Sequence, residues 1–238
     1  MKKISALILA LAMLLGLAAC GGEAAPEEVD INAKSEGVMT WAEYMAAESD
    51  SQVVIEAYVQ MVYKDDDGNT TVLLADGDGG YCAVLSGATS EELEALTDGC
   101  KLKITGNKED VDGEIEITGT AYEAEDGEYI PEIMDVTSLL GKDGLDDYQN
   151  MIVSFSGLTV ENWPSYNWDG SGSSGDDIYI DLSDGTYTYT FKVESSMFGS
   201  ETETYKAVNA LQKGAAVSVE AVCWNYEGLL PLITSVNQ

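Results

Sequence analysis

The sequence contains no arginine and no histidine, and its eleven basic residues are all lysines. Without guanidinium groups, the chain cannot capture a phosphate or a carboxylate through paired N–H donors. Without imidazole, it cannot build a Ser-His-Asp triad, a histidine-ligated zinc site or histidine-based acid–base chemistry. These absences exclude the histidine-dependent hydrolases and zinc enzymes as function classes.

Positive charge is scarce overall, because 43 acidic residues stand against the eleven lysines and give a formal net charge of −32. Proteins that bind nucleic acids neutralise phosphates with clustered Lys and Arg, so we expect no nucleic-acid partner. An acidic surface is also repelled by anionic lipid headgroups. By itself, this charge favours solubility and self-repulsion more than any specific role.

Cysteine is scarce too, with four residues in 238 and no Cys-x-x-Cys spacing among them. The thiols therefore indicate neither a metal site nor a redox motif, and we predict no metal and no cofactor. Cys82 and Cys100 are the plausible disulfide pair in an oxidising compartment, which would leave Cys223 free. Buried free thiols are the alternative.

The N-terminus combines a basic start at Lys2 and Lys3 with an apolar or small run over residues 4–17. This build is typical of a secretory signal peptide and is too short for a good bilayer span. The run leads into Leu-Ala-Ala-Cys at residues 17–20, which resembles the lipobox of bacterial lipoproteins. The resemblance implies cleavage before Cys20, acylation of that residue, and a mature chain anchored by lipid at the extracytoplasmic face of the cell membrane. An ordinary secreted protein with an incidental Cys20 is the alternative.

Composition and motif spacing divide the rest of the chain. Residues 20–37 are rich in Gly, Ala, Pro and acidic residues, which predicts a disordered tether after the signal peptide of residues 1–19. Thr40 and Glu43 have capping-box spacing and predict a short helix. We expect a first domain over residues 38–123, a connecting segment over 124–149 and a second domain over 150–238.

Alternating apolar and polar residues predict the same order of elements in both domains, namely three strands, a helix and two strands. In the first domain the strands are expected at 53–61, 70–74, 81–85, 101–105 and 114–118, with the helix at 89–96. In the second domain they are expected at 151–160, 177–182, 187–193, 216–224 and 229–236, with the helix at 201–211. The recurrence indicates an internal duplication.

This order resembles the OB-fold, a five-stranded barrel with a helix between strands three and four. The predicted fold class is all-β with short helices, arranged as two tandem five-stranded OB-fold-like barrels. Ala57 and Gly157, in the middle of the first strands, suit the sharp coiling of such a barrel. The lipobox, the opening at Met39–Met45 and the strand at Val53–Val59 together look like bacterial surface lipoproteins with OB-like domains. That resemblance carries no catalytic motif and implies fold and location alone.

The second domain has about fifteen more residues than the first between its first strand and its helix, mostly in the loop over residues 163–175. In OB-folds the loops between strands 1 and 2 and between strands 4 and 5 flank the ligand face. Three of the four tryptophans fall on these two loops, so the candidate ligand-binding residues are Trp163, Tyr166, Trp168, Trp224 and Tyr226. Exposed rings beside polar side chains suit sugars or peptides. The alternative is that the rings fold inward and close the end of the barrel.

Two acidic segments raise the question of calcium. Asp65, Asp67 and Asn69 have the first spacing of an EF-hand loop, but Thr70 stands where that loop needs glycine, so we predict a hairpin turn. A second hypothesis is that Asp169, Asp176 and Asp177 hold calcium and order the long loop.

These features together predict a lipid-anchored, non-enzymatic binding module that contacts a neutral or cationic glycan or peptide through the aromatic loops of its second domain. The alternative is a structural or assembly lipoprotein of the cell envelope that docks a protein partner through exposed strand edges. Carboxylate pairs for glycoside hydrolysis are abundant, but small barrels fill their interiors and leave no deep cleft. We therefore expect no enzyme activity.

Overall fold

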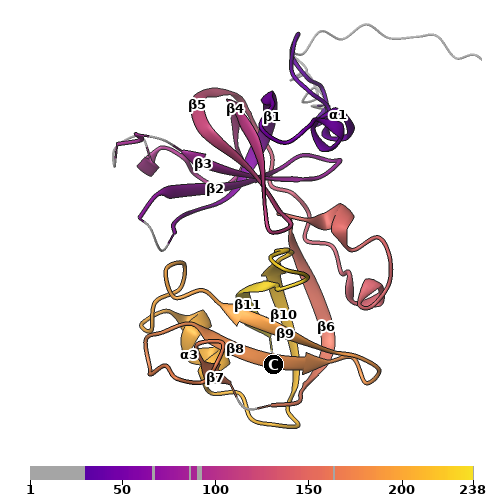
Figure 1. Ribbon diagram of the computed structural model, residues 1–238, viewed down its shortest axis with the longest axis vertical. Helices are drawn as coiled ribbons and strands as arrows, with labels where there is room; N and C mark the ends of the chain where they lie inside the picture. The colour runs from indigo at the N-terminus through magenta and orange to yellow at the C-terminus, as the bar shows by residue number, and fades with distance from the viewer. Residues whose placement is uncertain (1–29, 66–67, 86, 90–92, 163, 238) are drawn as a thin grey trace, which may run out of the picture. The chain divides into compact units, whose positions relative to one another are not determined.

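The computed structural model describes residues 30–65, 68–85, 87–89, 93–162 and 164–237 (Figure 1). The predicted signal peptide, Cys20 and Trp163 lie outside these residues. Contacts within the chain separate Met1–Asp30 from Ile31–Gln238, and the helices and strands of the described residues all belong to the second unit. No helix in the described ranges is long and apolar enough to cross a membrane.

The first domain opens with helix α1 (Trp41–Ala46), as its capping box predicts. The Glu43 N–H donates to Thr40 Oγ1 at 3.3 Å, and the Thr40 N–H donates to Glu43 Oε2 at 2.9 Å. At the other end of the helix, Lys108 Nζ donates to the carbonyl oxygens of Tyr44, Met45 and Ala47 at 3.0, 2.8 and 2.9 Å. The lysine thus satisfies carbonyl groups that the end of a helix leaves without intrahelical partners.

Five strands close into the first barrel in the order β1-β2-β3-β5-β4. Their bounds are β1 Gln52–Lys64, β2 Thr70–Ala75, β3 Gly80–Leu85, β4 Cys100–Val111 and β5 Glu114–Glu128. The pairing of β3 with β5 is parallel, and the others are antiparallel. This closed arrangement confirms the OB-fold prediction. In the segment where a helix is predicted over 89–96, Leu93 and Glu94 are helical, and residues 90–92 lie outside the described ones.

Strands β4 and β5 are longer than predicted because they form one continuous hairpin. Asp112 and Gly113 have φ angles of 55° and 101°, the left-handed pair that a two-residue hairpin turn needs. From this turn the pairing runs down to Cys100 opposite Glu128. The strands continue through polar residues because cross-strand hydrogen bonds hold the backbone where no apolar alternation marks it.

The second barrel repeats this order. Its elements are η1 Thr137–Leu139, η2 Asp146–Tyr148, β6 Ile152–Val160, β7 Ser165–Tyr166, β8 Ile178–Ser183, β9 Thr188–Val193, α3 Glu203–Asn209, β10 Ala216–Val222 and β11 Leu232–Asn237. The sheet order is β6-β10-β11-β9-β8-β7, and β6 also pairs with β8, so five strands follow one another in a ring. The short strand β7 was not predicted. Gly157 lies at an irregularity in the β6–β10 pairing with a φ of 66°, as its predicted coiling role requires.

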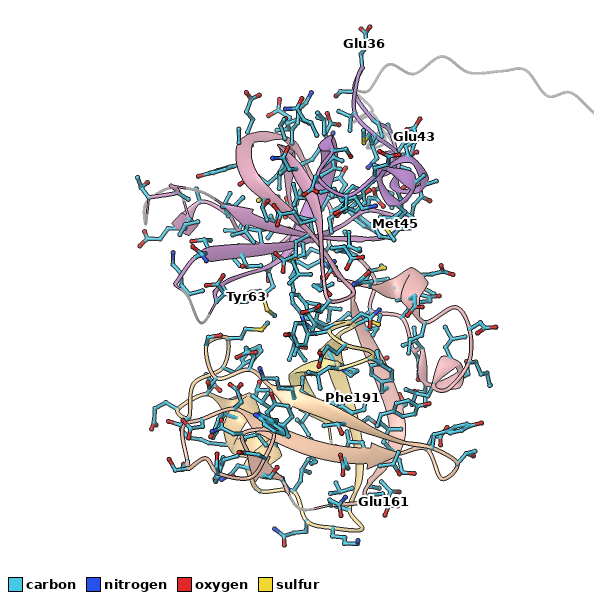
Figure 2. The ribbon with its side chains drawn as sticks, viewed as in Figure 1. Glu36, Glu43, Met45, Tyr63, Glu161 and Phe191 are labelled. Carbon is cyan, nitrogen blue, oxygen red and sulfur yellow. The ribbon has the colours of Figure 1, made fainter. Side chains whose placement is uncertain are left out.

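Alternation places one apolar core inside each ring. Val53, Ile55 and Ile104 belong to the first core. In the second core, the rings of Phe155 and Phe191 meet edge to face at 5.2 Å between centroids, and Figure 2 labels Phe191 within its barrel. Edge-to-face contact is a favourable geometry for aromatic pairs and adds to the energy of burial.

Two predicted domain boundaries need correction. The tether expected over residues 20–37 ends earlier, because Lys34 forms an ion pair of 2.6 Å with Asp76 and Ser35 donates to Glu56. The connecting segment expected over 124–149 is divided, since β5 runs to Glu128 while Val136, Leu140 and Leu145 pack in the second core. Both boundaries were set by local composition, whereas contacts distant in sequence decide them. The thiols of Cys82, Cys100 and Cys223 are free in this structure.

Within Ile31–Gln238, the two barrels meet at a junction formed by Gln60, Gly80 and residues 112–115 of the first and residues 149–152 and 225–227 of the second. Gln60 Nε2 donates to the Asn150 carbonyl at 3.1 Å, and the Ile152 N–H donates to Gln60 Oε1 at 3.0 Å. A Cβ atom on Gly80 would lie 2.6 Å from the backbone of residues 149–150, so glycine permits this approach. Beside these contacts, Leu73, Cys82, Val222 and Leu232 form a third apolar cluster.

Candidate functional site

A cavity of about 490 Å³ lies next to this junction and takes its walls from both barrels. The first barrel contributes Tyr63, Asp65, Thr71, Cys82, Val84, Val111, Glu114 and Glu116, and the second contributes Tyr179, Lys192, Glu194, Ser196, Trp224, Tyr226, Leu230 and Leu232. Tyr63, labelled in Figure 2, comes from the end of β1. The volume falls in the range of about 300–1,000 Å³ that is usual for small-molecule sites.

The first barrel gives the cavity an acidic wall. Glu114, at the start of β5, is only 1% exposed, and its Oε2 accepts hydrogen bonds from Gln149 Nε2 at 3.0 Å and from the Asn225 N–H at 3.2 Å. Its Oε1 is buried without a hydrogen-bond partner among the described residues. Burial raises the pKa of Glu114 to about 8, although these hydrogen bonds oppose the shift, and burial also raises the pKa of Glu116. A buried carboxyl with a displaced pKa in a cavity is a frequent mark of a functional site.

The second barrel gives the cavity its one lining lysine, Lys192 on β9. Lys192 Nζ lies 2.8 Å from Asp177 Oδ2, pairs with Glu194, and sits 5.6 Å from the centre of the Tyr179 ring. Burial would lower the pKa of Lys192, but the two carboxylates outweigh it and raise that pKa. The protein's own ammonium group is thus held by two carboxylates and an aromatic face.

Aromatic rings complete the walls. Trp224 is half-buried against the third apolar cluster, and Tyr226 is 44% exposed. Tyr63 and Tyr179 add two more rings, and burial raises the pKa of the Tyr63 hydroxyl. Flat apolar faces next to carboxylates are suited to a ligand that carries both an apolar body and a polar or positive group.

The sequence-predicted site residues separate into two groups. Trp224 and Tyr226 line this cavity, whereas Tyr166 and Trp168 lie outside its lining. Tyr166 belongs to β7 and donates its hydroxyl to Asn209 Oδ1 at 2.7 Å, next to α3, and Trp168 is 81% exposed. Trp163 lies outside the described residues. Among the described residues, the rings of the long loop and those of the loop after β10 therefore do not line one shared cavity.

Sequence reasoning missed the residues of the first barrel, above all Glu114 and Glu116. Both glutamates alternate with Ile115 and Ile117, which places them on the outer face of a barrel. The pattern cannot reveal that the second barrel covers this face. The turn at Asp112 and Gly113 was the available signal that a hairpin end projects here.

The described carboxylates of the two calcium hypotheses have other partners, and Asp67 lies outside the described residues. Asp65 Oδ1 accepts from the Asn69 N–H at 2.7 Å, and the pairing of Lys64 with Thr70 confirms that the segment joins β1 and β2 as a hairpin. Asp169 accepts from Ser171, Asp176 accepts from Ser173, and Asp177 pairs with Lys192. In the described ranges no three carboxylate or cysteine side chains gather in a way that could hold a metal ion.

No protein-family model matches the chain, and no curated protein matches it. Similar folds occur among solved structures. A murine DNA-binding protein bound to double-stranded DNA is 11% identical, with a TM-score of 0.37 over 76% of this chain and 90% of its own. A replication protein A heterotrimer bound to single-stranded DNA is 9% identical, with a TM-score of 0.32 over 86% of this chain and 69% of its own.

An Entamoeba histolytica asparaginyl-tRNA synthetase in complex with asparaginyl-adenylate is 24% identical, with a TM-score of 0.31 over 42% of this chain. The match spans only 25% of the synthetase chain. At these identities and scores the likenesses concern the fold alone.

The expectation that this chain has no nucleic-acid partner is nevertheless wrong, because its net charge does not exclude one. Similar OB-fold chains are bound to double-stranded or single-stranded DNA in their solved structures. The exclusion was drawn from a net charge summed over the whole chain, whereas an OB-fold recognises its ligand through one face and its flanking loops. The charge sum therefore does not decide the class of partner.

Proposed function

We propose that this protein is a non-enzymatic binding module whose ligand occupies the cavity between its two barrels. The observation that carries the proposal is the composition of that cavity, in which four aromatic rings and four carboxyl groups from both barrels surround about 490 Å³. Ring faces bind the apolar faces of a ligand, and carboxylates fix its donors or its positive charge. A peptide or a glycan, neutral or cationic, has this mixed character.

We also propose that lipid anchors the protein at the extracytoplasmic face of a membrane. The support is the basic start, the apolar run and the Leu-Ala-Ala-Cys motif at residues 17–20. In a bacterial host, the full chain should fractionate with membranes, whereas a Cys20→Ser variant should lose the lipid and leave the membrane fraction.

Binding should depend on Trp224 and not on Trp168. We would titrate the full chain in detergent against an array of glycans, peptides and a single-stranded oligonucleotide, reading tryptophan fluorescence and checking each ligand for turnover by mass spectrometry. Trp224→Ala should weaken binding by about tenfold or more, because it removes a half-buried aromatic ring from the lining of the cavity. Trp168→Ala is the matched control, since it deletes the same side chain from an exposed position outside the lining.

Because Trp224 packs against Leu232 and its neighbours, Trp224→Phe and Tyr226→Ala serve as milder variants that separate lost binding from lost folding. Equal loss from Trp168→Ala would move the site to the long loop. Unchanged affinity in both Trp224 variants would refute the cavity as the site. Ligand turnover would refute a purely binding role.

The alternative, docking of an envelope protein along exposed strand edges, receives less support. The first barrel is closed, and the additional β6–β8 pairing closes the second ring, which leaves only the two-residue strand β7 at the end of the described sheet. A strand that is paired on both sides offers no free edge for another strand.

A further inference from the structure

Carboxyl groups outnumber ammonium groups in the lining of the cavity. Its lining holds the carboxyl groups of Asp65, Glu114, Glu116 and Glu194 against the single ammonium group of Lys192. Lys192 is already paired with Glu194 and with Asp177. In the part of the chain that the structure describes, the ion pairs involve neither Asp65, Glu114 nor Glu116.

Glu114 adds an independent sign of a missing donor. Its side chain lines the cavity and is almost completely buried, yet Oε1 has no hydrogen-bond partner among the described residues. An unsatisfied buried acceptor costs free energy, and native proteins rarely retain one without a reason. A donor on a ligand would satisfy it.

Lys192 shows what kind of donor this cavity accepts. The protein places that ammonium between two carboxylates and 5.6 Å from the centre of an aromatic ring. The acidic wall has the same ingredients, namely carboxylates next to the rings of Tyr63 and Trp224. Val84, Leu230 and Leu232 also line the cavity and can contact an alkyl stem.

We infer that the cavity recognises a primary alkylammonium group, which the carboxylates of Glu114 and Glu116 receive while the aromatic and aliphatic lining contacts its carbon chain. This inference rests on the proposed function and names the ligand class of the same site. The group can belong to a lysine side chain of a peptide or to a free diamine. Both present a primary ammonium group with three N–H donors at the end of a short alkyl stem, and the diamine carries a second ammonium group.

Recognition of an ammonium group should be coupled to loss of a proton. Burial raises the pKa of Glu114 to about 8, so at neutral pH the protonated form predominates, and pairing with a cation favours the carboxylate. The proton leaves Glu114 for the buffer, and the ammonium keeps its own three protons. Affinity should therefore rise between about pH 6 and pH 8.5. The other titratable groups of the lining are Tyr63, Asp65, Cys82, Glu116, Tyr179, Lys192, Glu194 and Tyr226.

The test compares an ammonium ligand with its neutral acetylated counterpart and with a free diamine. Calorimetry on the full chain in detergent would use Nα-acetyl-lysine methylamide, its Nε-acetylated counterpart and 1,5-diaminopentane. The lysine amide should bind about tenfold or more tightly than the acetylated form, with release of a proton detectable by comparing buffers of different ionisation enthalpy. Binding of the diamine as well as the lysine amide identifies a free amine as sufficient, and preference for the lysine amide identifies a peptide.

Variants connect this selectivity to the acidic wall. Glu114→Gln should lose about tenfold in affinity for the lysine amide and lose the pH dependence, because its amide cannot carry the charge. Glu116→Gln tests the second carboxylate in case the first variant alters folding, which thermal melting would reveal. Glu201→Gln is the control, since Glu201 is an exposed carboxylate paired with Lys206 on the surface.

The outcomes separate the two proposals. Equal affinity for the charged and acetylated probes, together with Trp224-dependent binding of a neutral ligand, would overturn the ammonium inference and leave the binding function standing. Affinity for the lysine amide that survives both glutamine variants would also overturn it. If no probe and no array ligand bound with an affinity that depends on Trp224, the proposed function would be refuted as well.

Discussion

The two barrels share one strand order but close one end with different chemistry. The first barrel packs Tyr44 of α1 into its core and fixes the helix through Lys108 Nζ on three carbonyl oxygens. The second barrel packs Val136, Leu140 and Leu145 of its preceding segment into its core. Backbone hydrogen bonds hold each ring together, so the segment that packs against its core has only to exclude water. Polar contacts can fix that segment, as in the first barrel, and apolar contacts can fix it, as in the second.

The barrels also differ in where they bury charge. Among the described residues, the buried charged side chains are Glu56, Asp76, Lys108 and Glu114, all in the first barrel. Glu56 lies 2.9 Å from Lys101 and 3.6 Å from Lys103, and Asp76 lies 2.6 Å from Lys34. The second core is instead apolar around Phe155 and Phe191. The first barrel therefore depends on precise partners, which makes it more sensitive to single polar substitutions.

The largest expected loss of stability tests this difference at equivalent turns, between β2 and β3 in the first barrel and between β8 and β9 in the second. Asp76, between β2 and β3, accepts from Lys34 Nζ, from the N–H groups of Asp78 and Gly79, and from the Tyr81 hydroxyl. Asp76→Ala should cost about 3–5 kcal/mol, because it removes a buried carboxylate and leaves the Lys34 ammonium and three other donors without their acceptor. The measurement is urea denaturation of the full chain.

Asp184, between β8 and β9, is the matched position. It is exposed and accepts only from the N–H groups of Thr186 and Tyr187. Asp184→Ala should therefore move the denaturation midpoint far less than Asp76→Ala. Equal losses from the two variants would show that burial of charge does not distinguish the barrels.

The next effect concerns the pH dependence of stability, which should differ between Glu114 of the first barrel and Asp177 of the second. The pKa of Glu114, raised to about 8, lies above its usual value, so the folded state holds this proton more tightly than the unfolded state. Its contribution to stability is complete below about pH 4.5 and is lost as the pH rises through about 8. Glu114→Gln should remove this loss, which is a few kcal/mol, and flatten stability between pH 5 and 8.5 in urea titrations.

Asp177, which pairs with the lining residue Lys192, should shift stability with pH in the opposite sense. Burial would raise its pKa, but hydrogen bonds from Lys192 and Ser195 hold the pKa below its usual value. Its contribution is present above the usual carboxylate pKa and is lost as the pH falls through the acid range. In urea titrations, Asp177→Asn should therefore be less stable than the unmodified chain at neutral pH, and the difference should shrink as the pH falls through the acid range. A difference that stays constant through the acid range would contradict this assignment.

The smallest expected loss of stability tests the contrast between α1 and the segment that precedes β6. Lys108→Met keeps most of the side-chain volume but removes the ammonium donor from three carbonyl oxygens at α1, of which that of Tyr44 keeps the Ala47 N–H, so it should cost about 1–3 kcal/mol. Lys142→Met is the control. Lys142, in the segment that precedes β6, is exposed, and its ammonium group donates to the Ser138 carbonyl alone among the described residues. Thermal melting would show the first variant destabilised and the second close to the unmodified chain.

Local patterns in the sequence were sufficient for the elements that short-range physics decides. Alternation predicted the strands of both barrels, and the spacing of Thr40 and Glu43 predicted α1 with its capping box. The strand β7 was not predicted, because two residues are too few to show alternation of apolar and polar side chains. Its pairing with β8 forms only in the folded chain. The full length of β4 and β5 was not predicted, because the hydrogen bonds of the hairpin continue beyond the residues in which apolar and polar side chains alternate.

The sequence by itself determined which residues of each strand face inward, since side chains alternate along a strand whatever surrounds it. It placed Glu56, Gln60 and Glu114 on the outer face of the first barrel. Only the tertiary structure decided what covers that face: Ser35 and the lysines at Glu56, Asn150 and Ile152 at Gln60, and the cavity at Glu114. The physical reason is that a local period records the direction of a side chain, whereas its burial and its pKa depend on segments that arrive from elsewhere in the chain.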